Sequence, residues 1–237
     1  MHAVILAAGQ GTRLRSVIDD RPKGLIEVAG EPLVARSVRL LRDAGIEHVT
    51  IVAGYLAGRY AHFCFDHVGV TLVVNDAYAT TGSMASFATA IDAGVAGDLL
   101  LLEGDIIYEP RALTAILASP ADTATLVSGP TQAGDEVYVH AVDGRLCAMS
   151  KRMEDLPSTV GELVGITRLS ADAVAAMRDR FGAFVASNGH GRMDYETGAL
   201  VAIAQRRPVA VVVVPDLQWG EIDDERHHAR VTSMAWP

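Results

Sequence analysis

The sequence predicts an α/β protein with a Rossmann-like, doubly wound, mostly parallel sheet and a small inserted antiparallel β element. Three observations predict this fold class. Short apolar runs alternate with segments of helical periodicity through the first half of the chain. The first apolar run breaks directly into closely spaced glycines. In the second half, strand patterns follow one another around Asp143-Gly144, a dipeptide that favours a hairpin turn.

The first half of the chain predicts alternating strands and helices. We expect strands at 3–7, 48–53, 70–74 and 99–103. We expect helices at 32–44, 56–65, 83–93 and 110–117. Pro32 suits a first helical turn, Gly45 a C-terminal stop and Ser83 an N-cap. Right-handed crossovers between parallel strands then place helices on both faces of one sheet.

The second half of the chain predicts a different pattern, with strands in succession. We expect strands at 124–128, 136–142, 145–149, 163–169 and 209–214. We expect helices at 171–181, 195–204 and 222–231, the first of them capped by Ser170. Because no internal repeat or linker interrupts the chain, we expect a single domain over residues 1–237.

The composition limits the classes of partner. The chain has 237 residues, of which 50% are hydrophobic, and a net charge of −9 without a basic run. Disorder, nucleic-acid binding and binding to anionic membranes are therefore not expected. The two cysteines lack a metal-ligand spacing. The first apolar run is too short for a signal peptide, and no run approaches the roughly 20 residues of a membrane span, so we expect a cytoplasmic protein.

A glycine loop is the strongest local signal. Residues 6–14 read Leu-Ala-Ala-Gly-Gln-Gly-Thr-Arg-Leu, and Pro22-Lys23 follows. Glycines at a strand end let backbone N–H groups approach a phosphate or a base edge. Arg13 adds a forked donor, and Lys23 a point charge on a backbone that the proline restricts. A tight turn with surface basic residues is the alternative interpretation.

The dinucleotide fingerprint and the P-loop do not fit this segment, because Leu14 replaces the third glycine and no Gly-Lys-Ser/Thr is present. The loop instead resembles the signature of the sugar-phosphate nucleotidyltransferase superfamily, and the order of elements is similar over nearly the whole chain. The resemblance implies that the loop holds the nucleotide and that Lys23 neutralises the α-phosphate. The nucleotide-binding residues that it implies in this region are Leu6, Ala8, Gly9, Gly11, Thr12, Arg13 and Lys23.

Acidic residues follow two of the predicted strands. Asp105 comes after strand 99–103, and Asp223 lies in the acidic run 221–225 after the late strand. Ligand sites in open α/β sheets lie at the carboxyl ends of strands, and Mg²⁺ prefers oxygen ligands. The resemblance implies that Asp105 and Asp223 share Mg²⁺, although Asp223 could instead cap the last helix. The residues whose part in the metal site stays open are Glu103, Glu221 and Asp224.

The segment that begins at Thr81 resembles the base-contacting helix start of the superfamily. Its Gly82-Ser83 start, with no glutamine nearby, is most similar to the phosphocholine and 2-aminoethylphosphonate cytidylyltransferase branch. The resemblance therefore implies CTP, bound in part by Gly82 and Ser83; a merely capped helix is the alternative. Lys151 lies where related enzymes carry a lysine for the phosphate of the second substrate, and it joins Arg13 and Lys23 as a catalytic candidate. A surface lysine is the alternative.

Aromatic and acidic residues near the chain's end indicate a cationic substrate group. Tyr195 and Trp219 could present their rings to an ammonium, with Asp194 or Glu196 adding negative charge. Similar segments line the amine pocket in the choline-type branch. Alternatively, Asp194 caps a helix and both rings pack in the core.

These observations predict a Mg²⁺-dependent cytidylyltransferase. It would transfer CMP from CTP to a small amine-bearing phosphonate or phosphate, 2-aminoethylphosphonate or phosphocholine, with release of pyrophosphate. A sugar- or inositol-1-phosphate nucleotidyltransferase and an inactive nucleotide-binding regulator stay as alternatives. The oligomeric state stays open, a homodimer included. A structure that separates Lys23 from Asp105 would contradict the proposed chemistry.

Overall fold

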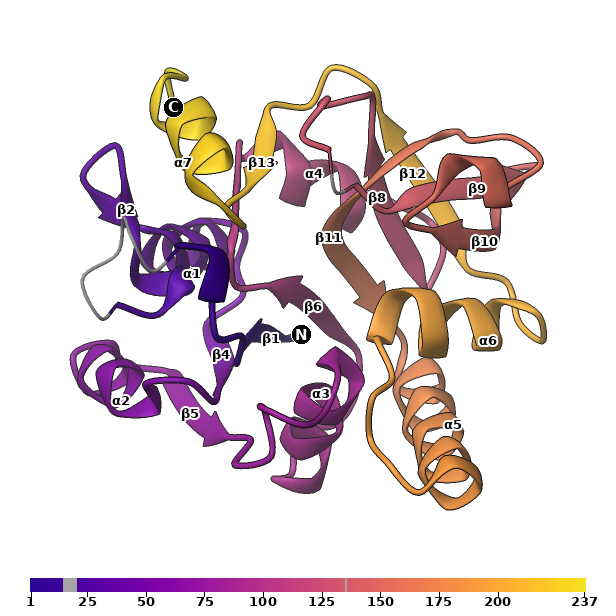
Figure 1. Ribbon diagram of the computed structural model, residues 1–237, viewed down its shortest axis with the longest axis horizontal. Coiled ribbons are helices and arrows are strands. Elements are labelled where there is room, and N and C mark those ends of the chain that lie inside the picture. The colour runs from indigo at the N-terminus through magenta and orange to yellow at the C-terminus, as the bar shows by residue number, and fades with distance from the viewer. Residues whose placement is uncertain (15–20, 135) are drawn as a thin grey trace.

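A computed structural model describes residues 1–14, 21–134 and 136–237. The strands of its main sheet are β1 (His2–Ala7), β4 (His48–Ala53), β5 (Val70–Val74), β6 (Leu99–Glu103), β8 (Ala124–Ser128), β9 (Tyr138–Val142), β10 (Arg145–Ser150), β11 (Gly161–Leu169) and β12 (Ala210–Val214). Within the described residues their order is β5-β4-β1-β6-β11-β8-β12-β10-β9. Figure 1 shows the sheet crossing the molecule, with β9 and β10 at the end opposite β5.

The sheet is mixed. Strands β5, β4, β1 and β6 are parallel to one another. Strand β11 runs antiparallel to β6 and β8, and the β9–β10 hairpin adds antiparallel pairing beyond β12. Strand β9 also pairs with the start of β11, so the five strands from β11 to β9 close on themselves. The expected α/β fold with a parallel sheet and an antiparallel addition is confirmed.

Helices cover both faces of the sheet (Figure 1). One face packs against α1 (Leu33–Asp43), α2 (Ala57–Phe65) and α4 (Arg111–Leu117). The other packs against α3 (Ser83–Asp92), α5 (Ala171–Asn188), the π-helical turn η4 (Tyr195–Leu200) and α6 (Val201–Ala204). Alternate residues of β1 supply the two cores, Ile5 to the first and Val4 to the second, as the two-residue period of a strand requires. No described helix has the length and apolar character to cross a membrane.

Short elements complete the chain. They are the 3₁₀ turns η1 (Thr12–Leu14), η2 (Lys23–Leu25) and η3 (Met153–Asp155), the strands β2 (Glu27–Val28), β3 (Glu31–Pro32), β7 (Ile106–Tyr108) and β13 (Trp219–Glu221), and helix α7 (Glu225–Thr232). In Figure 1, α7 lies beside α1 although the two are far apart in sequence. A third small core joins them, in which Leu14 of the glycine loop packs with Leu33, Ile222 and Val231.

Several expected element boundaries are wrong. Gly82, not Ser83, is the N-cap of α3, and the Ser83 side chain makes no capping bond. The last helix begins at Glu225 because the preceding residues pair as β13 with β7, a pair that the sequence pattern did not indicate. Its cap is Asp224, which accepts from the backbone N–H of His227 at 2.9 Å. The cap predicted at Ser170 is confirmed, since its side chain accepts from Ala173 N.

Candidate active site

The pairing of β7 with β13 brings two acidic segments together. Glu221 lies opposite Ile106 in this antiparallel pair. The backbone N–H of Ile222 donates to the carbonyl of Asp105 at 3.0 Å. Residues more than a hundred positions apart in the sequence are thereby held at the end of β6, where ligand sites of α/β sheets lie.

Lys23 lies between the two predicted metal-binding aspartates. Its Nζ is 3.1 Å from Asp105 Oδ2 and donates also to Asp223 Oδ1. Close backbone packing allows this, because a Cβ at Gly24 would come within 2.9 Å of the Gly104 carbonyl oxygen. The lysine loop, the segment that carries Lys23 and Gly24, therefore packs directly against the turn that carries Asp105.

The charge of Lys23 is secured by its neighbours. Burial alone would lower its pKa, but attraction to Asp105 and Asp223 outweighs burial and raises the pKa above the usual value. Arg13 adds a second cation, with Nη2 at 2.9 Å from Asp223 Oδ2. The structure thus brings together Arg13, Lys23, Asp105 and Asp223, which the sequence analysis had selected separately.

Arg13, Asp105 and Asp223 line the main cavity of the site, which has a volume of about 580 Å³. Its walls include most of the predicted site residues, namely Leu6, Ala8, Gly9, Arg13, Gly82, Ser83, Asp105, Lys151, Asp194, Tyr195, Glu196 and Asp223. Lys23 lines a small recess beside it, which shares Leu6, Gly9 and Asp105 with the main cavity. The glycine loop, the start of α3, the end of β10 and η4 therefore face one space.

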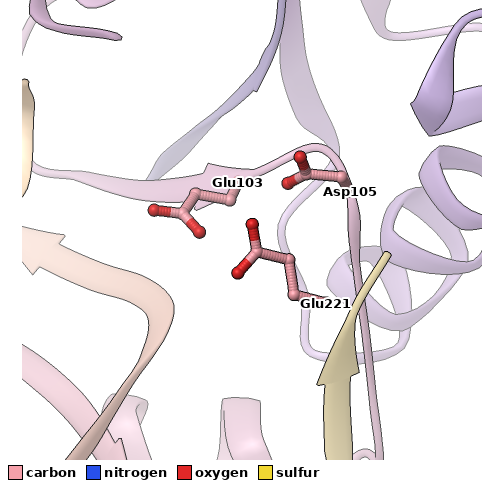
Figure 2. A group of neighbouring side chains, drawn as sticks. All are labelled: Glu103, Asp105 and Glu221. Atoms are coloured by element: carbon pink, nitrogen blue, oxygen red, sulfur yellow. The ribbon is translucent and has the colours of Figure 1, made fainter. Parts of the chain in front are cut away.

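A group of carboxylates lies at one wall of this cavity. Oxygens of Glu103, Asp105 and Glu221 lie within 4.8 Å of one another. Figure 2 shows the three carboxylates pointing toward a common space, from the end of β6, the following turn and β13. Burial, and then repulsion by Glu196 and Asp105, raise the pKa of Glu103 to about 8. Burial and the neighbouring carboxylates likewise raise the pKa of Glu221 well above its ordinary value.

The donor set of this wall fits a divalent cation. Carboxylate oxygens are the hard ligands that Mg²⁺ takes, together with phosphate and water oxygens. The ammonium of Lys23 already lies between Asp105 and Asp223, so these two carboxylates accommodate positive charge between them. Burial is the larger cause of the raised pKa values of Glu103 and Glu221, and repulsion among the neighbouring carboxylates adds to it; a bound cation would lower both pKa values.

The π-helical turn η4 supplies a further buried carboxylate. Glu196 is 6% exposed. Burial and then Asp194 raise its pKa to about 7, while attraction to Lys151 opposes the rise. Asp194 stands at the N-cap position of the turn, but its side chain makes no capping bond. The carboxylate of Asp194 therefore stays available to the cavity, contrary to the capping alternative.

The structure does not support every predicted contact. Trp219 is 6% exposed, its Nε1 donates to Ser128 Oγ at 2.6 Å, and it is absent from the walls of the main cavity. Its ring belongs to the first core. Tyr195 is fully buried, and its hydroxyl donates to Glu103 Oε1 at 2.9 Å. Neither ring is therefore presented as an open face. Gly11 and Thr12 do not line the cavity either, because the loop turns away into η1.

Sequence reasoning left out several cavity residues. They are Tyr78, Gly134 and Val137, and the carboxylates Glu103 and Glu221, which stayed unassigned; Thr81 and Ser86 lie in the segment that resembles the base-contacting helix start but were not selected individually. The helical spacing of Ser83 and Ser86 is a signal that could have identified the second serine. Another signal is composition, since only two of the 20 basic residues are lysines, Lys23 and Lys151. Both lie at this site, whereas arginine serves everywhere else.

Comparison with known proteins places these features in a family. The model of the family described as MobA-like NTP transferase domain matches residues 3–183. The chain is 32% identical over 241 residues to CMP-5'-(3-aminopropyl)phosphonate synthase of Streptomyces rubellomurinus, covering 94% of this chain and 37% of that protein. It is 32% identical over 116 residues to 2-aminoethylphosphonate cytidylyltransferase of Lancefieldella rimae, covering 46% of this chain and 47% of that protein. The matched region thus spans less than half of either relative.

Among solved structures, the chain resembles the inositol-1-phosphate CTP transferase from T. maritima. The two superpose with a TM-score of 0.81 at 20% sequence identity, covering 98% of this chain and 94% of that chain. At this identity the likeness establishes the shared fold.

Proposed function

The chain belongs to the MobA-like NTP transferase domain family, and on this premise we propose that it transfers CMP from CTP to a small aminoalkylphosphonate. Pyrophosphate is released, and Mg²⁺ assists. Phosphocholine is the second substrate to consider, and residues 1–237 form the single domain that acts. The observation that carries the proposal is the charge pattern of one cavity, which is lined by both cationic and anionic side chains.

The nucleotide belongs at the glycine loop and α3. Leu6, Ala8 and Gly9 form the wall that meets the start of α3 at Gly82. Arg13 and Lys23 stand at the edge of this wall and supply positive charge for the triphosphate. In a chain of net charge −9, such local concentration of cations is what lets a triphosphate bind.

Magnesium belongs at the carboxylate wall. Asp105 would bind it, and Asp223 and either Glu103 or Glu221 would be near enough to serve as further ligands. These residues would hold the metal where it would supply Lewis-acid chemistry, relieving the charge repulsion between a phosphoryl group and an anionic nucleophile. Lys23 would then be shared between the carboxylates and the α-phosphate, to which it offers its positive charge.

The second substrate belongs between Lys151 and the buried carboxylates. Lys151 follows β10 and offers a point charge to a phosphonate. Glu196 and Asp194 line the same cavity, with Glu196 near enough for its charge to interact with that of Lys151, and both would accept hydrogen bonds from a primary ammonium. A quaternary ammonium has no N–H to donate and depends on aromatic faces. Neither Trp219 nor Tyr195 offers such a face, so the buried carboxylates favour an aminoalkylphosphonate over phosphocholine. Tyr78, which also lines the cavity, lies in the loop before α3, on the side that we assign to the nucleotide.

The reaction needs no protein nucleophile. A phosphonate oxygen attacks the α-phosphorus of CTP, a P–O bond forms there, and the bond to pyrophosphate breaks. Lys151 would orient the attacking group, while Arg13 and Lys23 offset the charge on the triphosphate. Since a phosphonate is already anionic near neutral pH, no strong general base is required.

Pyrophosphate release with each of the four nucleoside triphosphates tests this proposal. The second substrates are 2-aminoethylphosphonate, phosphocholine, inositol-1-phosphate and glucose-1-phosphate. We expect the highest kcat/KM with CTP and 2-aminoethylphosphonate, and loss of turnover when EDTA removes the metal. Turnover only with a sugar or inositol phosphate would contradict the assignment, and nucleotide binding without turnover for any pair would favour a regulator.

A further inference from the structure

Two serines of α3, one helical turn apart, line the main cavity. They differ in what their hydroxyls already bind. Ser83 Oγ accepts from the backbone N–H of Tyr195 at 2.8 Å and donates to Glu196 Oε2 at 3.4 Å. Its donor and acceptor roles therefore serve the wall that we assign to the second substrate.

Ser86 is held by a single side chain. Asn75, the residue after β5, donates from Nδ2 to Ser86 Oγ at 3.0 Å and to Thr81 Oγ1 at 3.3 Å. Asn75 Oδ1 accepts from the backbone N–H of Ala77 at 3.0 Å. This last bond fixes the orientation of the amide, since an N–H group needs the oxygen and not the nitrogen as its partner.

In this network of Asn75, Thr81 and Ser86, one hydroxyl proton has no hydrogen-bond acceptor among the described residues. Thr81 Oγ1 donates to the carbonyl of Ala77 at 2.9 Å, so its hydrogen is in use. The Ser86 oxygen accepts from Asn75, and the part of the chain described by the structure offers the Ser86 hydrogen no partner. Ser86 is 4% exposed and its side chain lines the cavity. A buried donor of this kind calls for an acceptor atom on a ligand.

The nucleobase is the ligand that reaches this wall under the proposed function, on which the next step rests. Cytosine presents a hydrogen-bond acceptor at ring N3, whereas uracil presents an N–H donor at the same position. We propose that Ser86 selects cytosine by donating to N3, and that Asn75 is the positioning residue that points the Ser86 proton into the cavity. A site built to donate there rejects a ligand that also donates, because both groups would lose their partners on burial.

The test compares kcat/KM for CTP and UTP with saturating 2-aminoethylphosphonate. Ser86→Ala removes the donor and should lower the CTP-to-UTP preference about tenfold, the change that 1.4 kcal/mol produces. Asn75→Asp should lower it further, because the new carboxylate accepts the Ser86 proton and leaves a serine lone pair for the uracil N3–H. A merely structural role of Asn75 would reduce the activity with both nucleotides alike.

Two variants of α3 serve as comparisons. Thr89 donates its hydroxyl to the Ala85 carbonyl at 2.9 Å and does not line the cavity, so Thr89→Val should change neither rate nor preference. Ser83→Ala should raise KM for 2-aminoethylphosphonate and keep the preference for CTP. Circular dichroism and thermal unfolding establish that each variant is folded.

Separate outcomes decide separate claims. If Ser86→Ala leaves the CTP-to-UTP ratio of kcat/KM unchanged, including by lowering both values equally, the assignment of Ser86 is overturned. If wild-type protein shows no turnover with any nucleotide, the proposed function fails. Dissociation constants for CTP and UTP, measured by calorimetry, then decide the Ser86 assignment alone, with the same expected loss of preference in Ser86→Ala.

Discussion

At the scale of single residues, Lys23 is the side chain on which the geometry of the site depends most. Its ammonium joins Asp105 and Asp223, which lie more than a hundred residues apart in the sequence. The sequence analysis selected these three residues on different grounds, and the structure brings them together. Lys23 follows a proline and Asp105 follows a strand end, features that local sequence reveals. Asp223 was selected through the resemblance to the nucleotidyltransferase superfamily, because the strand before it, β13, was not predicted.

Replacing Lys23 with arginine should therefore abolish most of the activity. A guanidinium is wider than an ammonium, and the lysine loop packs closely on the Gly104 turn. We expect kcat to fall by about a hundredfold or more, corresponding to about 2.7 kcal/mol of lost transition-state stabilisation. Initial rates of pyrophosphate release measure the effect. Arg21→Lys is the matched exchange at an exposed position, and it should leave kcat unchanged.

Residues whose position depends on distant pairing were the ones that prediction placed wrongly. Trp219 is followed closely by acidic residues in the sequence and seemed to belong with them. In β13, which pairs with β7, the Trp219 ring packs in the core and Glu221 lines the cavity. The two residues are two positions apart and so lie on the same side of β13, and which side that is follows from a pairing that local pattern does not reveal.

At the scale of elements, the sequence predicted strands and helices well wherever a long apolar period was present. Strands β1, β4, β5 and β6 lie within a residue of their expected bounds. The three-residue strands β7 and β13 were missed. Such short segments show no hydrophobic periodicity, and each is a strand because it pairs with the other. The π-helical form of η4, which places Glu196 in the cavity, was equally beyond local patterning.

The cap of α5 provides a stability test at this scale. Ser170 Oγ accepts from the backbone N–H of Ala173 at 3.2 Å, satisfying one of the free N–H groups at the helix start. Ser170→Ala should lower the free energy of unfolding by about 1 kcal/mol. Ser187→Ala, near the exposed end of the same helix, should lower it by clearly less. Urea titration compares the two, and equal values would contradict the capping role.

At the scale of the whole molecule, the fold holds several carboxylates in a buried space at a cost in stability. The pKa of Glu196 rises from 4.5 to about 7 in the folded protein. The folded state thus binds this proton more tightly than the unfolded chain, so stability is greatest at low pH and falls as pH rises from 4.5 through about 7. Such a cost is expected where a site must receive a cation.

Glu196→Gln should therefore stabilise the protein without substrates at pH 8. The rise in pKa corresponds to about 3 kcal/mol, an upper value because neighbouring carboxylates share the effect. Little change is expected at pH 5, where the wild-type carboxyl is already largely protonated. Urea unfolding at both pH values measures the difference, with exposed Glu47→Gln as the comparison. A gain of equal size at pH 5 and pH 8 would contradict a charge effect.

One cavity is lined both by cationic side chains that suit phosphate groups and by buried carboxylates that suit an ammonium, so the substrate's amine should be essential. The direct measurement compares 2-aminoethylphosphonate with propylphosphonate, in which a methyl group replaces the amine. With CTP and Mg²⁺, we expect kcat/KM to be at least about a hundredfold higher for the amine, since the methyl group would leave buried carboxylates without a partner. Equal kcat/KM values for the two phosphonates would contradict the account.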